Sequence, residues 1–269
     1  MKAAVIQFHS SENKKYNIQK AVRFVCEALQ NKAQFVVLPE VFHYRGAKSW
    51  EEMRGVAEKI PGESTLPFMD LARRHKAFIL CGSIYEKIPA TPKVYNTSVL
   101  INPRGKAAAL YRKMHLFDAV IGGLAIRESE VFRAGQRPVM SRVQEFNVGL
   151  SICYDLRFPE LYQTYSRNGA HVVCVPSCFT KMTGQAHWEV LLKARAIENL
   201  CYVLAPNQTG KDARGILCFG HSMIVDPWGK VLAAASRDKE EVIYAHLHLA
   251  TIEQKRKILP KLVTHNLSR

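Results

Sequence analysis

The segment NVGLSICYDLRFPELY, residues 147–162, contains the sharpest change of polarity in the chain. Its first residues are apolar and predict a buried strand that ends at Cys153, and a helix is expected over residues 158–169. Open α/β sheets hold their functional sites at the carboxyl ends of strands, and the amide groups at a helix start favour a thiolate. We therefore predict that Cys153 is a nucleophile, although at this point a buried structural cysteine is the alternative.

The rest of the chain alternates between strand and helix patterns. Helices are predicted over residues 16–33, 64–76, 158–169, 185–200 and 251–259. Strands are predicted over residues 1–8, 34–40, 78–87, 94–103, 106–114, 147–154, 171–177 and 201–207, then a hairpin over 219–235 and a strand over 240–249. Because no low-complexity linker divides these elements, the pattern predicts one mixed-sheet α/β domain over residues 1–269, with helices outside.

The composition favours a cytoplasmic protein without cofactors. Seven cysteines, an odd number, lie mostly in apolar runs, which is typical of reduced thiols rather than of a disulfide framework. Cys174 and Cys178 lack a second pair of ligands at zinc-binding spacing, so no metal site is expected. The first apolar run is too short for a signal peptide or a membrane span, and we expect no membrane association.

The basic charge of the chain raises a different class of function. Lys and Arg total 38 against 23 Asp and Glu, a formal net charge of +15, which could attract nucleic acid or anionic metabolites. The basic residues are scattered, and no recognisable nucleic-acid-binding motif accompanies them. Nucleic-acid binding is therefore a remote alternative, and a preference for anionic substrates is the weaker corollary.

Two further strand ends carry residues that could assist a cysteine. In VVLPEVF, residues 36–42, an apolar strand runs into Glu40, and in LYRKMHLFD, residues 110–118, Lys113 follows an apolar stretch. Taken singly, each could be an ordinary surface residue. Together with Cys153 they make a hydrolytic device, in which the glutamate takes the thiol proton and later activates water, while the lysine and a backbone amide stabilise the oxyanion. Such a site attacks an amide or nitrile carbon and hydrolyses a thioester.

These motifs resemble those of a known family. VVLPEVF, YRKMHLF and SICYDLRFPELY resemble the glutamate, lysine and cysteine motifs of the nitrilase, or carbon–nitrogen hydrolase, superfamily, in family order. GHSMIVDPWG, residues 220–229, resembles a further hairpin of that family, so that the match covers nearly the whole chain. The resemblance implies a four-layer α-β-β-α sandwich that pairs into homodimers or higher oligomers, with the tail at about residues 250–269 in the dimer interface.

The resemblance also implies a second glutamate, which positions the lysine and the substrate amide. Glu128 matches it best, because it lies seven residues before Gly135. Glu130 is the alternative, and Asp118 fits less well. The surrounding segment DAVIGGLAIRESE, with adjacent glycines at 122 and 123, is expected to be a loop that borders the pocket.

The cysteine motif resembles the amidase branch that acts on small carboxylate-bearing amides, of the deaminated glutathione or α-ketoglutaramate type. Hydrolysis of N-carbamoyl amino acids or of nitriles is the alternative within the same fold. The resemblance implies that Arg157 binds the substrate carboxylate and that Thr183 assists it, although Arg157 could instead tie the loop to Glu160 or Asp155. Tyr154 is expected to supply the oxyanion amide through its backbone.

Three further positions are candidate substrate contacts. Tyr44 or Arg45 could reach the substrate from the EVFHYRGAK segment. His187 could line the pocket, whereas the neighbouring Trp188 is expected to belong to the core.

Overall fold

The computed structural model describes residues 1–47, 49–121 and 123–260, whose strands form two six-stranded sheets and a small hairpin. The first sheet has the order β14 (Glu241–His246), β1 (Lys2–Gln7), β2 (Phe35–Val37), β3 (Phe78–Lys87), β4 (Val94–Ile101), β5 (Ala107–Arg112). The second has the order β13 (Val231–Ala234), β12 (Met223–Val225), β11 (Tyr202–Ala205), β10 (Val172–Cys174), β9 (Phe146–Leu150), β8 (Val139–Val143).

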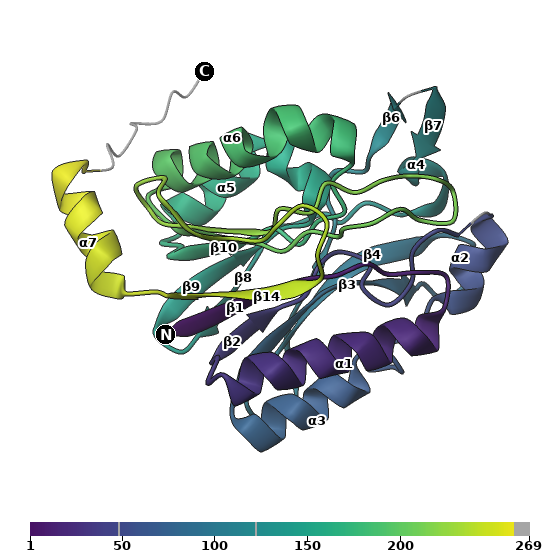
Figure 1. The fold of residues 1–269 in the computed structure, drawn as a ribbon, viewed down its shortest axis with the longest axis horizontal. Coiled ribbons are helices and arrows are strands. Elements are labelled where there is room, and N and C mark those ends of the chain that lie inside the picture. The colour runs from purple at the N-terminus through teal and green to yellow at the C-terminus, as the bar shows by residue number, and fades with distance from the viewer. Residues whose placement is uncertain (48, 122, 261–269) are drawn as a thin grey trace.

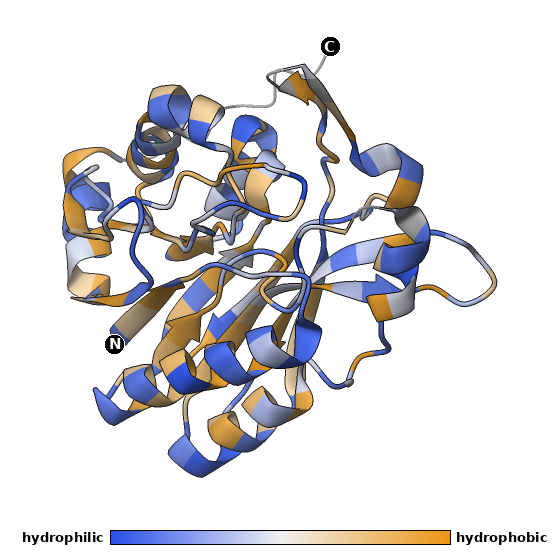
Figure 2. Ribbon diagram, turned by 45° about the vertical axis from the view of Figure 1, so that its right-hand side comes forward, coloured by the Kyte–Doolittle hydropathy of each residue, from blue (hydrophilic) through white to orange (hydrophobic). Residues whose placement is uncertain are grey.

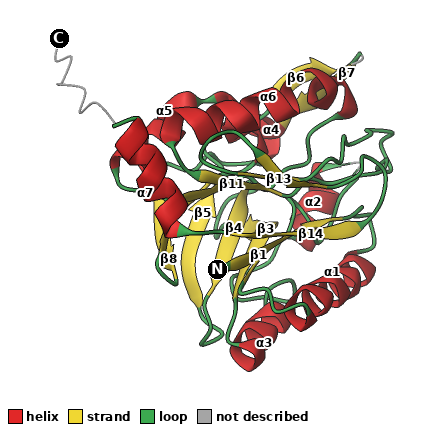
Figure 3. Ribbon diagram, turned by 60° about the vertical axis from the view of Figure 1, so that its left-hand side comes forward, coloured by secondary structure: helices red, strands yellow, loops and turns green. Residues whose placement is uncertain are grey.

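The two sheets lie face to face between two layers of helices (Figures 1 and 3). Helices α1 (Lys14–Gln30) and α3 (Leu66–His75) cover the first sheet, and α5 (Pro159–Arg167) and α6 (Lys181–Asn199) cover the second (Figure 1). Apolar residues colour the strands between the layers, and polar residues colour the outer helix faces (Figure 2). The predicted four-layer α-β-β-α sandwich is therefore confirmed.

Strand β1 explains why its sequence is apolar without alternation. Ala3 and Val5 belong to the cluster between the sheets, whereas Ala4 and Ile6 belong to the cluster under α1 and α3. Successive side chains of a strand point to opposite faces, so a strand covered on both sides must be apolar throughout. This double burial fixes the register of the sheet that carries the site.

The strand directions bring three strand ends to one edge. Strands β1, β2 and β3 run parallel, and β4 runs antiparallel to both β3 and β5, so that β5 runs in the direction of β3. The carboxyl ends of β2 and β5 therefore point the same way, and Glu40 and Lys113 follow them. In the facing sheet, Cys153 follows β9, which runs parallel to β10 and through it to β11.

Helix α2 (Trp50–Val56) and strand β8 were not predicted from the sequence, and two further segments differ from their prediction. Residues expected to form a loop instead pair as a hairpin of β6 (Asp118–Ile121) and β7 (Leu124–Arg127), which leads into α4 (Glu128–Val131). Gly123 takes φ +84° at the turn, a conformation that glycine adopts without strain, and Gly122 lies outside the described residues. Helix α6 begins at Lys181, earlier than expected, because the Thr180 side chain caps the amide of Thr183.

The remaining elements are short. They are α2 (Trp50–Val56), the 3₁₀ helix η1 (Cys153–Arg157) and α7 (Leu249–Ile258). A single domain over residues 1–269 and a dimer contact through about 250–269 both stay predictions, and residues 261–269 lie outside the described chain. Within the described residues no helix has the length and apolar character needed to cross a membrane.

Gly82 in β3 allows a close approach that shapes the site. A Cβ atom there would lie 1.9 Å from the carbonyl oxygen of Leu38 and 2.4 Å from that of Pro39, directly before Glu40. We predict that Gly82→Ala lowers the free energy of unfolding by about 3 kcal/mol, because the clash is with backbone that cannot rotate away. Gly55→Ala is the matched control, since an added Cβ meets nothing within 4 Å there and helix α2 should gain about 0.5–1 kcal/mol. Urea unfolding of both variants checks this, and equal midpoints would contradict it.

Candidate active site

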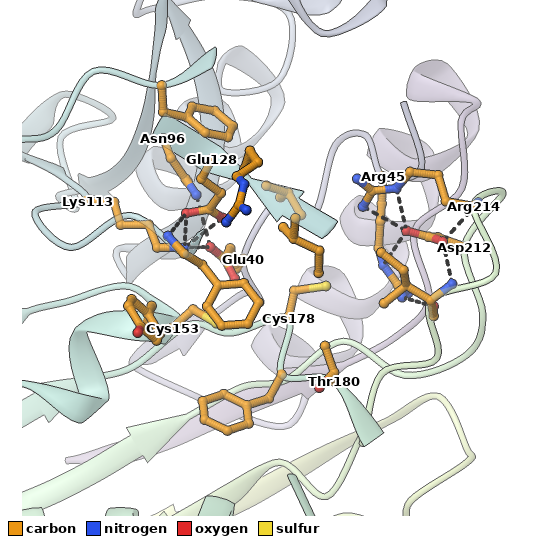
Figure 4. A pocket seen from close by; sticks show the side chains of 18 of the residues that line it. Glu40, Arg45, Asn96, Lys113, Glu128, Cys153, Cys178, Thr180, Asp212 and Arg214 are labelled. Carbon is orange, nitrogen blue, oxygen red and sulfur yellow. Dashed lines mark hydrogen bonds and ion pairs between the residues drawn. The ribbon is translucent and has the colours of Figure 1, made fainter. Parts of the chain in front are cut away.

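The three strand ends meet at a pocket of about 990 Å³ of empty space, part of which opens to solvent. Glu40, Lys113, Glu128 and Cys153 line it together (Figure 4). The structure therefore brings together four residues that are distant in sequence and that were expected to act together.

Lys113 lies at the centre of the polar part of this pocket. Its side chain is 1% exposed, and its Nζ lies 2.9 Å from Glu40 Oε1 and 3.0 Å from Glu128 Oε1. Burial alone would lower the pKa of this ammonium, but the carboxylates of Glu128 and Glu40 outweigh it and raise the pKa well above its ordinary value. Lys113 is therefore a permanent cation at neutral pH.

Glu128, rather than the alternatives, reaches this lysine. Burial raises the pKa of Glu128, and the charge of Lys113 opposes that rise. Its second oxygen, Oε2, accepts the amide hydrogen of Phe117 at 2.8 Å. Glu130 is exposed, and the exposed Asp118 accepts a hydrogen bond from the Ser129 amide instead.

One carboxylate oxygen of Glu40 accepts two hydrogen bonds. Oε1 accepts hydrogen bonds from Lys113 Nζ and from Asn96 Nδ2, both at 2.9 Å. Within residues 1–47, 49–121 and 123–260, Oε2 has no hydrogen-bond partner. Glu40 can therefore accept a proton at Oε2 without losing the contacts that orient it.

Asn96 was missed by the sequence analysis. It lies 2% exposed in β4, within the buried polar run of Asn96, Thr97 and Ser98. Three consecutive buried polar residues are unusual in a strand, and this signal could have drawn attention to it. Asn96 acts on the site by orienting the carboxylate of Glu40.

Cys153 sits at a strained turn after β9. Its φ is +47°, in the left-handed region that non-glycine residues seldom adopt, and its amide donates to the Pro176 carbonyl at 2.9 Å. The buried carboxylate of Asp155 fixes the turn, because it accepts hydrogen bonds from the Ile152 amide, the Tyr111 hydroxyl and the His115 amide. Strain at a well-anchored turn is typical of functional sites.

The expected thiolate is not supported by the surroundings of Cys153. Burial and the negative charge of Glu40 raise the pKa of this thiol well above its ordinary value, although Lys113 and the backbone amide of Cys178 oppose the rise. The sequence prediction was wrong on this point, because removal from water outweighs the short helix η1. Cys153 rests as a neutral thiol and needs a base to become a nucleophile.

The residues expected to bind substrate divide into two groups. Arg157, Thr183 and Tyr154 line the pocket. Tyr44 does not, and its hydroxyl bonds instead to Glu52, which is also outside the lining. The neighbouring Arg45 lines the pocket in its place.

Arg157 does not tie the loop to a carboxylate. Its Nη2 lies 3.3 Å from His187 Nδ1, and its guanidinium stacks over the Phe179 ring at 5.2 Å. In the described part of the chain it has no carboxylate partner, and Asp155 bonds elsewhere. His187 itself is not among the lining residues, and Trp188 is fully buried core as expected.

Two lining residues, Asp212 and Arg214, were not foreseen. They lie on a loop between β11 and β12 with no apolar periodicity, so the sequence carries no signal for them. Among the described residues, no cluster of three or more histidine, cysteine and acidic side chains is arranged to hold a metal ion.

Comparison with known proteins agrees with this geometry. Residues 2–257 match the carbon-nitrogen hydrolase family. The protein belongs to the carbon–nitrogen hydrolase family. The match includes all the strand ends described above, and it confirms the resemblance inferred from the motifs.

Individual relatives are similar over almost the full length of the chain. A deaminated glutathione amidase of Synechocystis sp. is 42% identical over 97% of this chain and 96% of that protein. The human omega-amidase NIT2 is 38% identical over 96% of this chain and 92% of that protein. The crystal structure of the Caenorhabditis elegans NitFhit protein superposes with a TM-score of 0.92 at 36% identity, covering 98% of this chain, which spans 65% of that longer chain.

The buried lysine provides a test of the site's electrostatics. Lys113→Met leaves two buried carboxylates without their cation, and we predict a loss of about 3–5 kcal/mol in the free energy of unfolding at about pH 7.5. The pKa of Glu128 is already raised in the folded state, so the free energy that Glu128 contributes to folding decreases as pH rises. Removing the Lys113 charge raises this pKa further and makes that decrease larger. The loss should therefore be smaller at about pH 5, where the pair can hold a proton.

Urea unfolding at both pH values measures this, with Lys106→Met as the control. Lys106 is exposed at the start of β5, so its replacement should change stability by less than about 0.5 kcal/mol. A loss at Lys113→Met that is independent of pH would contradict the prediction.

Proposed function

We propose that this protein is a cysteine-dependent amidase that hydrolyses a small carboxylate-bearing amide through a thioester on Cys153. The proposal is carried by three groups that line one pocket: a thiol whose raised pKa keeps it neutral, a carboxylate whose Oε2 has no hydrogen-bond partner in the described part of the chain, and an ammonium held by two carboxylates. A neutral thiol requires a general base, and the presence of Glu40 in the same pocket supports that role for it.

The acylation half of the reaction follows from these roles. Glu40 takes the thiol proton while the sulfur attacks the amide carbon. The tetrahedral oxyanion is stabilised by the Lys113 ammonium and by the backbone amide of Tyr154. Glu40 then returns the proton to the departing nitrogen, the carbon–nitrogen bond breaks, and ammonia or an amine leaves a thioester on Cys153.

The second half hydrolyses the thioester with the same groups. Glu40 removes a proton from water as the water oxygen attacks the thioester carbon, and the proton passes to the cysteine sulfur as the carbon–sulfur bond breaks. The products are a carboxylic acid and the neutral thiol with which the cycle began. Glu128 holds Lys113 in place through both halves and can also accept a hydrogen bond from the substrate amide.

The proposed substrate class rests on Arg157. This guanidinium lines the pocket beside Tyr154 and has no carboxylate partner in the described chain, so a substrate carboxylate can occupy it in a bidentate manner. Thr183, whose hydroxyl lies 2.9 Å from that of Thr180, is placed to assist. The names of the relatives, deaminated glutathione amidase and omega-amidase, support the same class.

The nucleophile is tested by replacing it. Cys153→Ala should lower amide hydrolysis by at least about 1,000-fold, because the proposed acyl intermediate forms on the Cys153 sulfur. The assay is product release from a panel containing carboxylate-bearing amides, neutral amides, N-carbamoyl amino acids and nitriles.

Cys26→Ala is the matched control, since Cys26 lies in α1 on the far side of the first sheet from the pocket, and it should leave rates within about twofold. Thermal unfolding verifies that both variants fold. Hydrolysis that survives in Cys153→Ala, or a wild-type preference for nitriles, would overturn the proposed function.

A further inference from the structure

The pocket has a second cationic region, separate from the catalytic residues. Arg45 and Arg214 flank Asp212 there, and in Figure 4 this group lies across the pocket from Cys153, with Cys178 between them. We propose that Arg214 binds a second substrate carboxylate, one carried on the amine side of the amide that is cleaved. This inference rests on the proposed function and narrows its substrate class.

Arg45 builds the base of this region. Its side chain is 2% exposed, and it donates to the carbonyl oxygens of Thr209 at 3.1 Å, Gly210 at 3.3 Å and Ile216 at 2.7 Å. These bonds fasten both ends of the loop over residues 209–216 to one buried guanidinium. The loop is therefore a fixed part of the pocket wall, and its side chains have defined positions.

Asp212 orients Arg214 from within the loop. Its Oδ1 accepts the amide hydrogens of Arg214 at 3.0 Å and Ile216 at 2.9 Å. Its Oδ2 accepts Nε and Nη2 of Arg214 at 3.2 and 3.0 Å. Among the residues that the structure describes, Nη1 of Arg214 has no acceptor, and this side chain is 34% exposed, so that it remains available to a ligand.

The charges in this region do not cancel. Asp212 is the carboxylate partner of Arg214 and also lies 3.9 Å from Arg45 Nε, so that two guanidinium groups share one carboxylate. Over the whole pocket the lining includes five cationic side chains and three carboxylates. A ligand with two negative charges complements that surplus, whereas a ligand with one leaves part of it unmatched.

The two arginines assigned to substrate carboxylates come from different elements of the pocket wall. Arg157 lies four residues after Cys153 in η1 and stacks near Tyr154 and Phe179. Arg214 lies on the loop across the pocket. With the acyl-side carboxylate bound at Arg157, as in the proposed function, the group left for Arg214 across the pocket is a carboxylate on the amine side.

This geometry distinguishes two kinds of amide. A primary amide of α-ketoglutaramate type has one carboxylate, on the acyl side, and releases ammonia, so that nothing in it reaches Arg214. An amide with the same acyl group whose amine is a short peptide ends in a second carboxylate. The preferred substrates are therefore N-substituted amides that release a carboxylate-bearing amine, as deaminated glutathione would.

The test compares two substrates that share one acyl group, namely α-ketoglutaramate and deaminated glutathione. We expect Arg214→Gln to lower the ratio of kcat/KM for deaminated glutathione to that for α-ketoglutaramate by about 10- to 100-fold, mainly through KM, as for the loss of one charged hydrogen-bonding pair. Arg214→Lys keeps the positive charge but loses the planar guanidinium with its several donors. Its ratio of the two kcat/KM values should lie between those of wild type and Arg214→Gln.

Two comparison variants make the result specific. Lys211→Gln removes the same charge from the same loop, but Lys211 is exposed and outside the pocket lining, so both kcat/KM values should stay within about twofold. Arg157→Gln removes the anchor for the shared acyl carboxylate and should lower both substrates alike, with the ratio unchanged.

The outcomes separate this inference from the proposed function. If wild type hydrolyses both substrates and Arg214→Gln leaves the ratio unchanged or lowers both values equally, the amine-side site is wrong and the amidase stands. The same holds if Lys211→Gln changes the ratio as much as Arg214→Gln does. If the wild type hydrolyses neither substrate, both the proposed function and this inference fail.

Discussion

The arrangement of the site depends on one buried cation between two carboxylates. An ammonium with 1% exposure is tolerated only when opposite charges and hydrogen bonds replace water, and Glu40 and Glu128 provide them at 2.9 and 3.0 Å to Lys113. The three residues come from different segments: Glu40 follows β2, Lys113 follows β5, and Glu128 begins α4. The ion cluster therefore locks three separate chain segments at the place where the two sheets end together.

This cluster also decides the state of the nucleophile. Glu40 and burial raise the pKa of the Cys153 thiol, and Lys113 compensates only in part because its charge is shared with two carboxylates. These effects favour the neutral thiol, and in the proposed mechanism its proton passes to Glu40 Oε2, which has no hydrogen-bond partner among the described residues. Asn96 contributes by occupying the other oxygen, which holds the carboxylate in one orientation.

The sequence predicted the parts of the site that lie on regular elements. Glu40 and Cys153 each follow a buried strand, and Lys113 follows the apolar but largely exposed strand β5, so the end of an apolar run marks all three. Loop residues show no comparable pattern in the sequence. The sequence therefore could not distinguish Tyr44 from Arg45 as a pocket residue, and only Arg45 lines the pocket. Three other pocket residues were not predicted, because their roles depend on contacts between segments that are distant in sequence. These residues are Asn96, Asp212 and Arg214. The thiolate expectation failed for a related reason, since the burial of Cys153 depends on the packing of both sheets.

The ionisation of Cys153 tests the central claim most directly. The difference in ultraviolet thiolate absorbance between the wild-type protein and Cys153→Ser, followed from about pH 5 to about pH 10, isolates this one sulfur. The account predicts no Cys153 thiolate at neutral pH and its appearance only above the range in which ordinary cysteines ionise. A full equivalent of Cys153 thiolate at neutral pH would contradict the account, because a preformed cysteine–lysine ion pair would then make Glu40 unnecessary as the base.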